Sequence, residues 1–474
     1  MATNRRWLAL VAIALATFMT YLDNNVVNVA LPSIQRDLHL TISGLEWIAS
    51  AYILVFAGLL LVGGRLADAV GKRVAFLGGL TLFTLASLVA GLAGSQEVLI
   101  GARAAQGVGA ALLTPTALAL LPALFPDPRE RATAFGVWGG VGALALAVGP
   151  FTGGYLSQHA SWGWIFLINV PIGVATVVLT LASIRAEERG GRRRLDLPGV
   201  VSSAIALFAV TYALIEGESK GWTSGIILGS FALAAVAAIV FVVIETRSAE
   251  PMVDLSYFRT RVFTGGLLAM GIWAFGVFGI YFYTAIYLQN ALGFSPTGAG
   301  AAFVPMALVM AVVAAVGPRI EARFGVHRTT AIALGLMAIS LAAISRVGEG
   351  SGYSDLLPWF LVYGVGGGLL LPLVNVVIGA LPLQRAGMAS GMLNVSREVF
   401  GLLGITVLGA ILSNREHAAT GAELHRYLVG YQFSLVVAAI VIAVGAPLAW
   451  FTLRGTRSSE PASAPVPEPV LETV

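Results

Sequence analysis

GGRLADAVGKR (residues 63–73) is a short charged segment between two long apolar runs, and GPRIEARFGVHR (residues 317–328) repeats its pattern 254 residues later. In both copies glycines flank the charged residues. Tight turns between helices need glycine, and the charged side chains can cross-link helix ends at a polar surface. The repeat predicts a chain built from two related halves, with chance similarity between glycine-rich loops as the alternative.

The composition of the whole chain is that of a membrane protein. Of its 474 residues, 57% are hydrophobic and only 11% are charged, whereas a soluble chain carries about 25% charged residues. A soluble fold needs a polar exterior that this sequence cannot supply, which argues against a soluble enzyme, a nucleic-acid binder and a fibrous protein. The lack of cysteine excludes disulfides, thiol catalysis and cysteine-based metal sites.

Fourteen apolar runs are long enough to cross a bilayer, which takes about 20 residues. They lie near 7–31, 45–66, 74–94, 98–124, 133–157, 163–184, 199–216, 224–245, 262–289, 298–318, 328–346, 356–382, 387–412 and 429–453. With the N-terminus in the cytoplasm, 21 of the 28 Lys and Arg residues fall in cytoplasmic segments, five in outer loops and two inside spans. This asymmetry follows the positive-inside rule and predicts that both termini are cytoplasmic.

The runs and breaks predict four parts of an all-α integral membrane protein. We expect an N-terminal six-helix bundle (1–184), a linker with two extra transmembrane helices (185–261), a C-terminal six-helix bundle (262–456) and a disordered cytoplasmic tail (457–474). The two extra helices have no function that the sequence assigns. We expect them at the periphery, because their only acidic residues lie at their ends.

Six motifs then point to a family. The loop 64–73 is one; LDNNVVNVALP (22–32), WIFLINVPIG (164–173) and DLPG (196–199) are three more. The others are R-x-x-Q-G-x-G, formed by Arg103, Gln106, Gly107 and Gly109, and a glycine motif formed by Gly142, Gly149, Pro150, Gly153 and Gly154. Together they resemble the major facilitator superfamily, and within it the fourteen-span drug:proton antiporters.

The resemblance implies a major facilitator fold, in which two six-helix bundles exchange a drug for protons without ATP. It also implies roles in conformational gating, which we assign to Gly64, Arg65, Asp68, Gly71, Arg73, Gly149 and Pro150. Asp68 and Arg73 lie at the expected cytoplasmic surface, where a simple solvated loop is the alternative. Gly149 and Pro150 are expected to permit close helix contact and bending.

Four charged residues lie clearly inside the expected spans: Asp23, Arg103, Arg397 and Glu398. A charge at the bilayer centre costs at least about 2.5 kcal/mol. At 1.5 Å per residue, Asp23 and Arg103 lie roughly 12 Å and 8 Å from the outer surface, so they can pair, and Glu398 lies near the midplane. We expect Asp23, Glu398 and Arg103 to couple protons to transport; structural ion pairs are the alternative.

The expected mechanism uses burial of a carboxyl group, which favours its protonated form. Opened outward, Asp23 or Glu398 would accept a proton as substrate leaves; opened inward, the freed carboxylate would attract a cationic substrate. The expected substrate-binding residues are Asp23, Asn24, Asn28, Tyr52, Tyr281, Tyr283, Asn394, Arg397 and Glu398. Aromatic faces attract organic cations, so Tyr21, Trp47 and Trp273 are further wall candidates, with packing or a membrane-interface position as the alternative.

The sequence therefore predicts a proton-coupled antiporter that exports hydrophobic, cationic drugs or antibiotics across the bacterial cytoplasmic membrane. Its alternative is a dedicated exporter of one self-made metabolite by the same mechanism. We expect a monomer surrounded by lipid, with a small-molecule substrate and protons as partners and no nucleic acid, cofactor or metal. An outer group of Glu416, His417, Glu423 and His425 is interpreted as a hydrated loop, and no G-x-x-x-x-G-K-[ST] motif supports an ATP pump.

Overall fold

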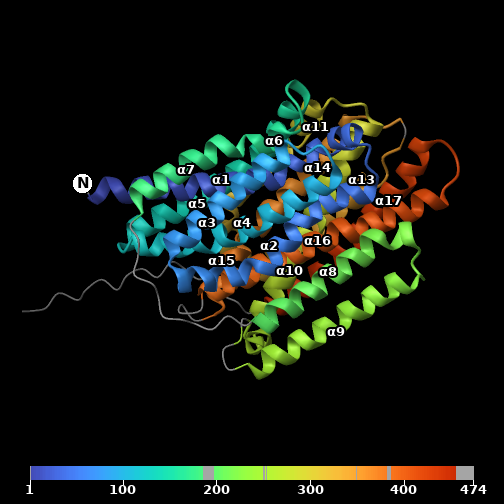
Figure 1. Cartoon of the computed structure of the whole chain (residues 1–474). Helices are drawn as coiled ribbons and strands as arrows, with labels where there is room; N and C mark the ends of the chain where they lie inside the picture. The colour runs from blue at the N-terminus through green and yellow to red at the C-terminus, as the bar shows by residue number, and fades with distance from the viewer. Residues whose placement is uncertain are drawn as a thin grey trace, which may run out of the picture.

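The computed structural model describes residues 2–184, 197–248, 251, 253–348, 350–381 and 386–454. These residues form a bundle of long helices and no strand (Figure 1). Within them, thirteen helices are long and apolar enough to cross a membrane. A further helix of 32 residues, α5, stands where the fifth span was expected. The expected all-α membrane fold is confirmed, whereas the tail 457–474 lies outside the described residues.

The first half of the chain forms six spans. They are α1 (Ala2–Leu38), α2 (Ile42–Val70), α3 (Lys72–Gly91), α4 (Gln96–Leu124), α5 (Pro128–His159), and the pair α6 (Trp164–Leu167) and α7 (Asn169–Ser183). The sixth span is broken at Ile168. Its two pieces still follow one another across the predicted run 163–184.

The last part of the chain repeats this arrangement. Its spans are α10 (Arg261–Ile286) with the π-helical turn η2 (Tyr287–Ala291), α11 (Pro296–Ala302) with α12 (Val304–Phe324), α13 (Val326–Ile344), α14 (Tyr353–Leu370) with α15 (Leu373–Gly379), α16 (Ala386–Ala418) and α17 (Glu423–Thr452). The pairing of helices is also repeated. As α1 packs on α5 and α2 on α4, so α10 packs on α16 and α12 on α14.

The two copies of the charged loop have the same backbone geometry. Gly71 joins α2 to α3 with φ 95°, and Gly325 joins α12 to α13 with φ 85°. A residue with a Cβ adopts such positive φ values only with strain, which explains glycine at both turns. The internal repeat predicted from the sequence is thus present in the structure. We call the end of the molecule that carries these turns the inner end, and the opposite end the outer end.

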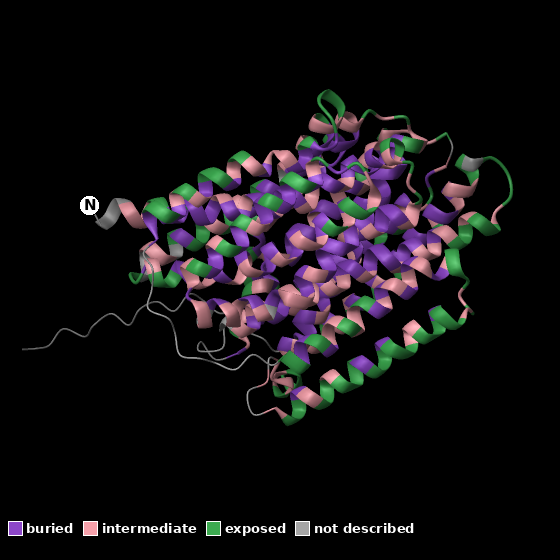
Figure 2. Cartoon of the chain, viewed as in Figure 1, coloured by how far each residue is buried: buried purple, intermediate pink, exposed green. Residues whose placement is uncertain are grey.

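The two extra helices, α8 (Leu197–Lys220) and α9 (Gly225–Arg247), lie along one side of the bundle (Figure 1), and the short helix η1 (Leu255–Arg259) follows them. α9 packs on α8 and is exposed along most of its length (Figure 2), as expected of a peripheral helix. α8 instead packs against both α2 and α16, which belong to different halves. It therefore covers the junction between the two halves.

The two halves are packed together at the outer end. There Gly154 on α5 lies against the backbone of Pro296, and Gly300 on α11 lies against the backbone of Pro150. The Gln289 side chain also donates a hydrogen bond to the Val29 carbonyl oxygen at 2.8 Å. By contrast, most of residues 135–140, in the inner part of α5, are exposed. The structure is therefore closed at its outer end.

Candidate functional site

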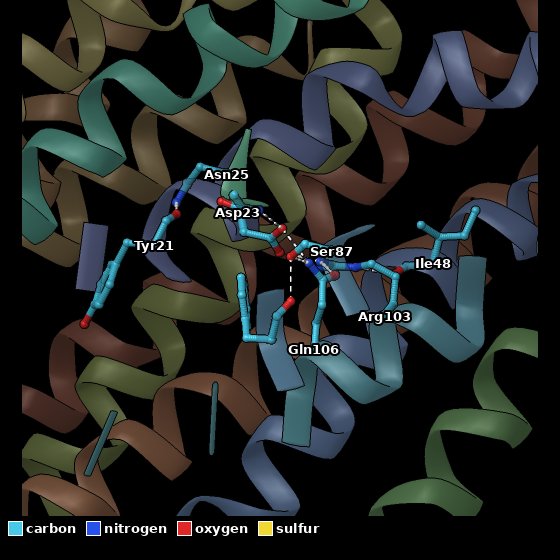
Figure 3. A network of polar contacts seen from close by, with 9 residues as sticks. Tyr21, Asp23, Asn25, Ile48, Ser87, Arg103 and Gln106 are labelled. Carbon is cyan, nitrogen blue, oxygen red and sulfur yellow. Dashed lines mark hydrogen bonds and ion pairs between the residues drawn. The ribbon is translucent and has the colours of Figure 1, made fainter. Parts of the chain in front are cut away.

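A buried charge network surrounds Asp23 in the first half (Figure 3). Asp23 is fully buried on α1, and its Oδ2 accepts a hydrogen bond from Arg103 Nη1 on α4 at 2.5 Å. Its Oδ1 accepts hydrogen bonds from Gln106 Nε2 at 2.9 Å and from Asn169 Nδ2 at 3.0 Å. The expected pairing of Asp23 with Arg103 is confirmed. Three donors together satisfy the carboxylate, as a buried anion requires.

Further contacts anchor this network to neighbouring helices. Arg103 Nε donates to the Ile48 carbonyl oxygen on α2 at 3.2 Å, and its guanidinium lies 4.5 Å from the centre of the Tyr52 ring. Gln106 accepts from Arg103 Nη1 at 2.8 Å and donates to Ser87 Oγ on α3 at 2.8 Å. Because Arg103 and Gln106 are three residues apart on one helix, they share a face. The network joins α1, α2, α3, α4 and α7.

The second charge pair lies on α16 and is less complete. Arg397 donates from Nη2 to Glu398 Oε1 at 2.9 Å, so the ion pair that was the alternative interpretation of these two residues is present. Glu398 is 1% exposed, and its Oε2 is buried without a hydrogen-bond partner among the described residues. Arg397 reaches out of the second half toward the first, with its guanidinium 5.8 Å from the centre of the Tyr21 ring. Both oxygens of Asp23 therefore accept hydrogen bonds, whereas Glu398 Oε2 accepts none from the described residues.

One cavity between the two halves adjoins both pairs. It is lined by residues of α1, α2 and α4 on one side and of α10, α12 and α16 on the other. The lining residues are Tyr21, Asn24, Asn25, Val27, Asn28, Ala49, Ile53, Arg103, Trp273, Val277, Phe278, Tyr281, Met310, Arg397 and Ile405. Four of the residues expected to bind substrate are among them, namely Asn24, Asn28, Tyr281 and Arg397. Asp23 and Glu398 lie behind the two arginines.

The structure places three other expected substrate ligands away from this lining. Tyr52 is buried against Arg103, and Asn394 donates to the Ser390 carbonyl oxygen of its own helix at 3.0 Å. Tyr283 is buried and bonded to Glu46. Their roles in substrate binding stay predictions.

Two aromatic wall candidates, Tyr21 and Trp273, do line the cavity. A third, Trp47, faces α8 instead and donates to Glu216 Oε1 at 2.9 Å.

The residues expected to control gating occupy two places. At the inner end, Arg65 donates to the Pro251 carbonyl oxygen, and Arg73 donates to the Leu181 carbonyl oxygen in the last turn of α7 at 3.3 Å. A cation at the C-terminus of a helix is favourable there. Gly64 and Gly71 lie on and after the last turns of α2, and the side chain of Asp68 lies outside the described part of the chain.

The remaining gating candidates, Gly149 and Pro150, lie in the outer half of α5. A Cβ at position 149 would meet Asn25 Cβ at 2.7 Å, and the backbone of Pro150 touches Gly300. Both residues therefore lie at close contacts, one with α1 and one with α11 of the second half. This placement suits a role in packing the closed outer end.

Sequence reasoning missed two groups of residues. Gln106 and Asn169 belong to motifs noted in the sequence, yet their bonds to Asp23 depend on helix orientations that a motif does not reveal. Glu46 was not counted among the charges inside spans, because it falls at the first residues of the run 45–66. In the structure it lies on the second turn of α2 and is only 3% exposed. Hydropathy alone does not distinguish a buried acid at the end of an apolar run from an exposed acid in the neighbouring loop.

Comparison with known proteins identifies the family. The model of the Major Facilitator Superfamily matches residues 13–405. The chain is 34% identical to the puromycin resistance protein pur8 of Streptomyces alboniger, over 98% of this chain and 94% of that protein. It is 35% identical to the multidrug resistance protein Stp of Mycobacterium tuberculosis, over 93% and 82% of the two chains. It is also 35% identical to the tetracenomycin C resistance and export protein of Streptomyces glaucescens, over 87% and 77%.

Solved structures agree at the level of the fold. A bacterial homologue of the human lysosomal transporter Spinster, in an inward-facing conformation, superposes with a TM-score of 0.67 at 16% identity, covering 95% of this chain and 97% of the other. The helical repeat, the cavity between the halves and these relatives lead to one conclusion: the chain is a membrane transporter that belongs to the Major Facilitator Superfamily.

Proposed function

We propose that this transporter is a proton-coupled antiporter that exports hydrophobic, cationic drugs or antibiotics across the bacterial cytoplasmic membrane. Relatives named for resistance to puromycin, to several drugs and to tetracenomycin C support a drug-export role. In the proposed orientation both termini are cytoplasmic, and the inner end faces the cytoplasm. The bundles predicted as 1–184 and 262–456 would move against each other around the cavity.

One observation carries the proposal: each half contributes a buried acid that lies behind an arginine of the same cavity. Of the two acids, Glu398 is better suited to bind and release a proton. Its Oε2 accepts no hydrogen bond among the described residues, so Arg397 alone stabilises its anion through Oε1, whereas Asp23 is stabilised as an anion by three donors. We therefore assign the exchanged proton to Glu398 and a positioning role to Asp23.

The exchange then follows from competition for one carboxylate. When the cavity opens outward, Glu398 takes a proton from the outside, and the cationic substrate loses its counter-charge and leaves. When the cavity opens inward, the proton departs to the cytoplasm and the carboxylate is again available to a cation. Tyr21, Trp273 and Tyr281 offer aromatic faces to the substrate beside it, an interaction worth about 2 kcal/mol when desolvated.

The test is transport of a cationic dye, ethidium, by proteoliposomes under an imposed pH gradient. We expect Glu398→Gln to abolish uphill transport while dye still equilibrates down its own gradient. Glu97→Gln, which removes an exposed acid near the outer end of α4, serves as the control and should behave as wild type. Uphill transport by Glu398→Gln at the wild-type rate would remove Glu398 from the coupling mechanism.

A further inference from the structure

Glu46 is a buried acid that the proposed exchange does not use. It lies on the second turn of α2, near the outer end, and is 3% exposed. Its carboxyl group faces Tyr283 on α10 and Gly409 on α16, both of the other half. A Cβ at position 409 would collide with Glu46 Oε1 and with the Tyr283 hydroxyl. Glycine at this position leaves room for a carboxyl group from the first half to enter the second.

The hydrogen bonds around Tyr283 reveal where the protons lie. Tyr283 Oη is 2.8 Å from Glu46 Oε1 and 2.7 Å from the Ile405 carbonyl oxygen. A phenol carries one hydrogen, and a carbonyl oxygen only accepts. If Glu46 were a carboxylate, it and the Ile405 carbonyl oxygen would compete for that hydrogen. One of the two short oxygen–oxygen contacts would then have no hydrogen between its atoms. If Glu46 is protonated, it donates to Tyr283, which donates to Ile405, and both contacts are satisfied.

The charges around Glu46 agree with a neutral carboxyl group. Among the described residues Glu46 forms no ion pair. Glu216 on α8 repels a second negative charge at Glu46, although Glu216 is itself bonded to Trp47 and lies 3.4 Å from Lys220 Nζ. On α10 the titratable group that faces Glu46 is Tyr283, and α16 places Gly409 and the Ile405 carbonyl oxygen at this contact.

We propose that Glu46 is a proton-binding site of the outer gate, by which we mean the contact of α2 with α10 and α16 at the outer end. With the outer ends closed, Glu46 is neutral and links α2 to α10 and α16 through Tyr283. When the halves separate at the outer end, the carboxyl group meets water and releases its proton to the outside. Protons outside the cell therefore favour outer closure. The proposal requires only that the outer ends separate, and it does not depend on which substrate or ion crosses the cavity.

The test is a spin-label distance across the outer gate. The chain has no native cysteine, so labels can be placed by Ser161→Cys after α5 and Thr420→Cys after α16, both exposed. The measurements use an Asp23→Asn, Glu398→Gln background, so that the coupling acids do not contribute. Between about pH 5 and about pH 9, we expect the ratio of open to closed outer gate to rise by up to about tenfold per pH unit, the limit for one proton.

Glu46→Gln in the same background should remain closed at every pH, because its amide can donate to Tyr283 as the protonated acid does. Tyr283→Phe should raise the open-to-closed ratio about fivefold at low pH, since it removes the link between the halves. Glu216→Gln should keep the pH dependence. No pH dependence in the background protein, or an unchanged one after Glu46→Gln, would overturn the proposal, and neither result bears on Glu398.

Discussion

Replacing Gln106 by methionine tests the charge network around Asp23 most sharply. Methionine has nearly the length of glutamine but no polar group, so Gln106→Met removes bonds with little change in volume. The structure assigns Gln106 one bond to Asp23, one from Arg103 and one to Ser87. Hydrogen bonds to charged groups contribute about 1.5–3 kcal/mol each, so we expect a loss of about 3 kcal/mol or more in the free energy of unfolding.

A second variant allows the loss in unfolding free energy to be compared with that of Gln106→Met. Asn169→Leu removes only one bond to Asp23, and we expect about half the loss, roughly 1.5–3 kcal/mol. Unfolding in mixed micelles can be followed by the fluorescence of the nine tryptophans. Asn414→Leu, at an exposed position of α16, is the control. The reasoning fails if all three variants lie within about 0.5 kcal/mol of one another, the range of ordinary surface substitutions.

Three further changes have defined outcomes. Gly71→Ala or Gly325→Ala forces a Cβ into a positive-φ turn and should cost about 1–2 kcal/mol in unfolding free energy, whereas an equal cost at exposed Gly78 would refute the strain argument. Gly300→Leu should hold the outer ends apart, seen as a longer spin-label distance there; an unchanged distance would mean that the close contact with α5 does not matter. Trp47→Phe removes the bond to α8 and should speed hydrogen exchange in α8 while sparing α9, which packs on α8.

The sequence predicts the fold well because membrane spans depend mainly on length and apolar content. Each of the fourteen runs coincides with a helix or a pair of short helices. What hydropathy does not indicate is how a span is interrupted. The break at Ile168 lies inside an apolar run and the π-helical turn at Tyr287–Ala291 spans the end of one, and mean hydropathy does not distinguish either from a continuous span.

The candidate site is only partly predictable for a related reason. The depth of Asp23 and Arg103 follows from counting residues along each helix, and their pairing could be expected from it. Which face of a helix meets the cavity depends on packing between helices. For that reason Tyr281 was placed correctly in the cavity wall, whereas neighbouring Tyr283 faces Glu46.

The central claim is that Glu398 releases a proton when a cationic substrate binds. Purified transporter in weakly buffered detergent solution, mixed with ethidium in the presence of a pH indicator, reports this event without transport. We expect wild-type protein to release protons in proportion to the dye bound. Glu398→Gln lacks both the exchangeable proton and the counter-charge, so it should bind dye more weakly and release no protons with the dye that it does bind at higher concentration. Equal proton release by wild type and Glu398→Gln would contradict the account.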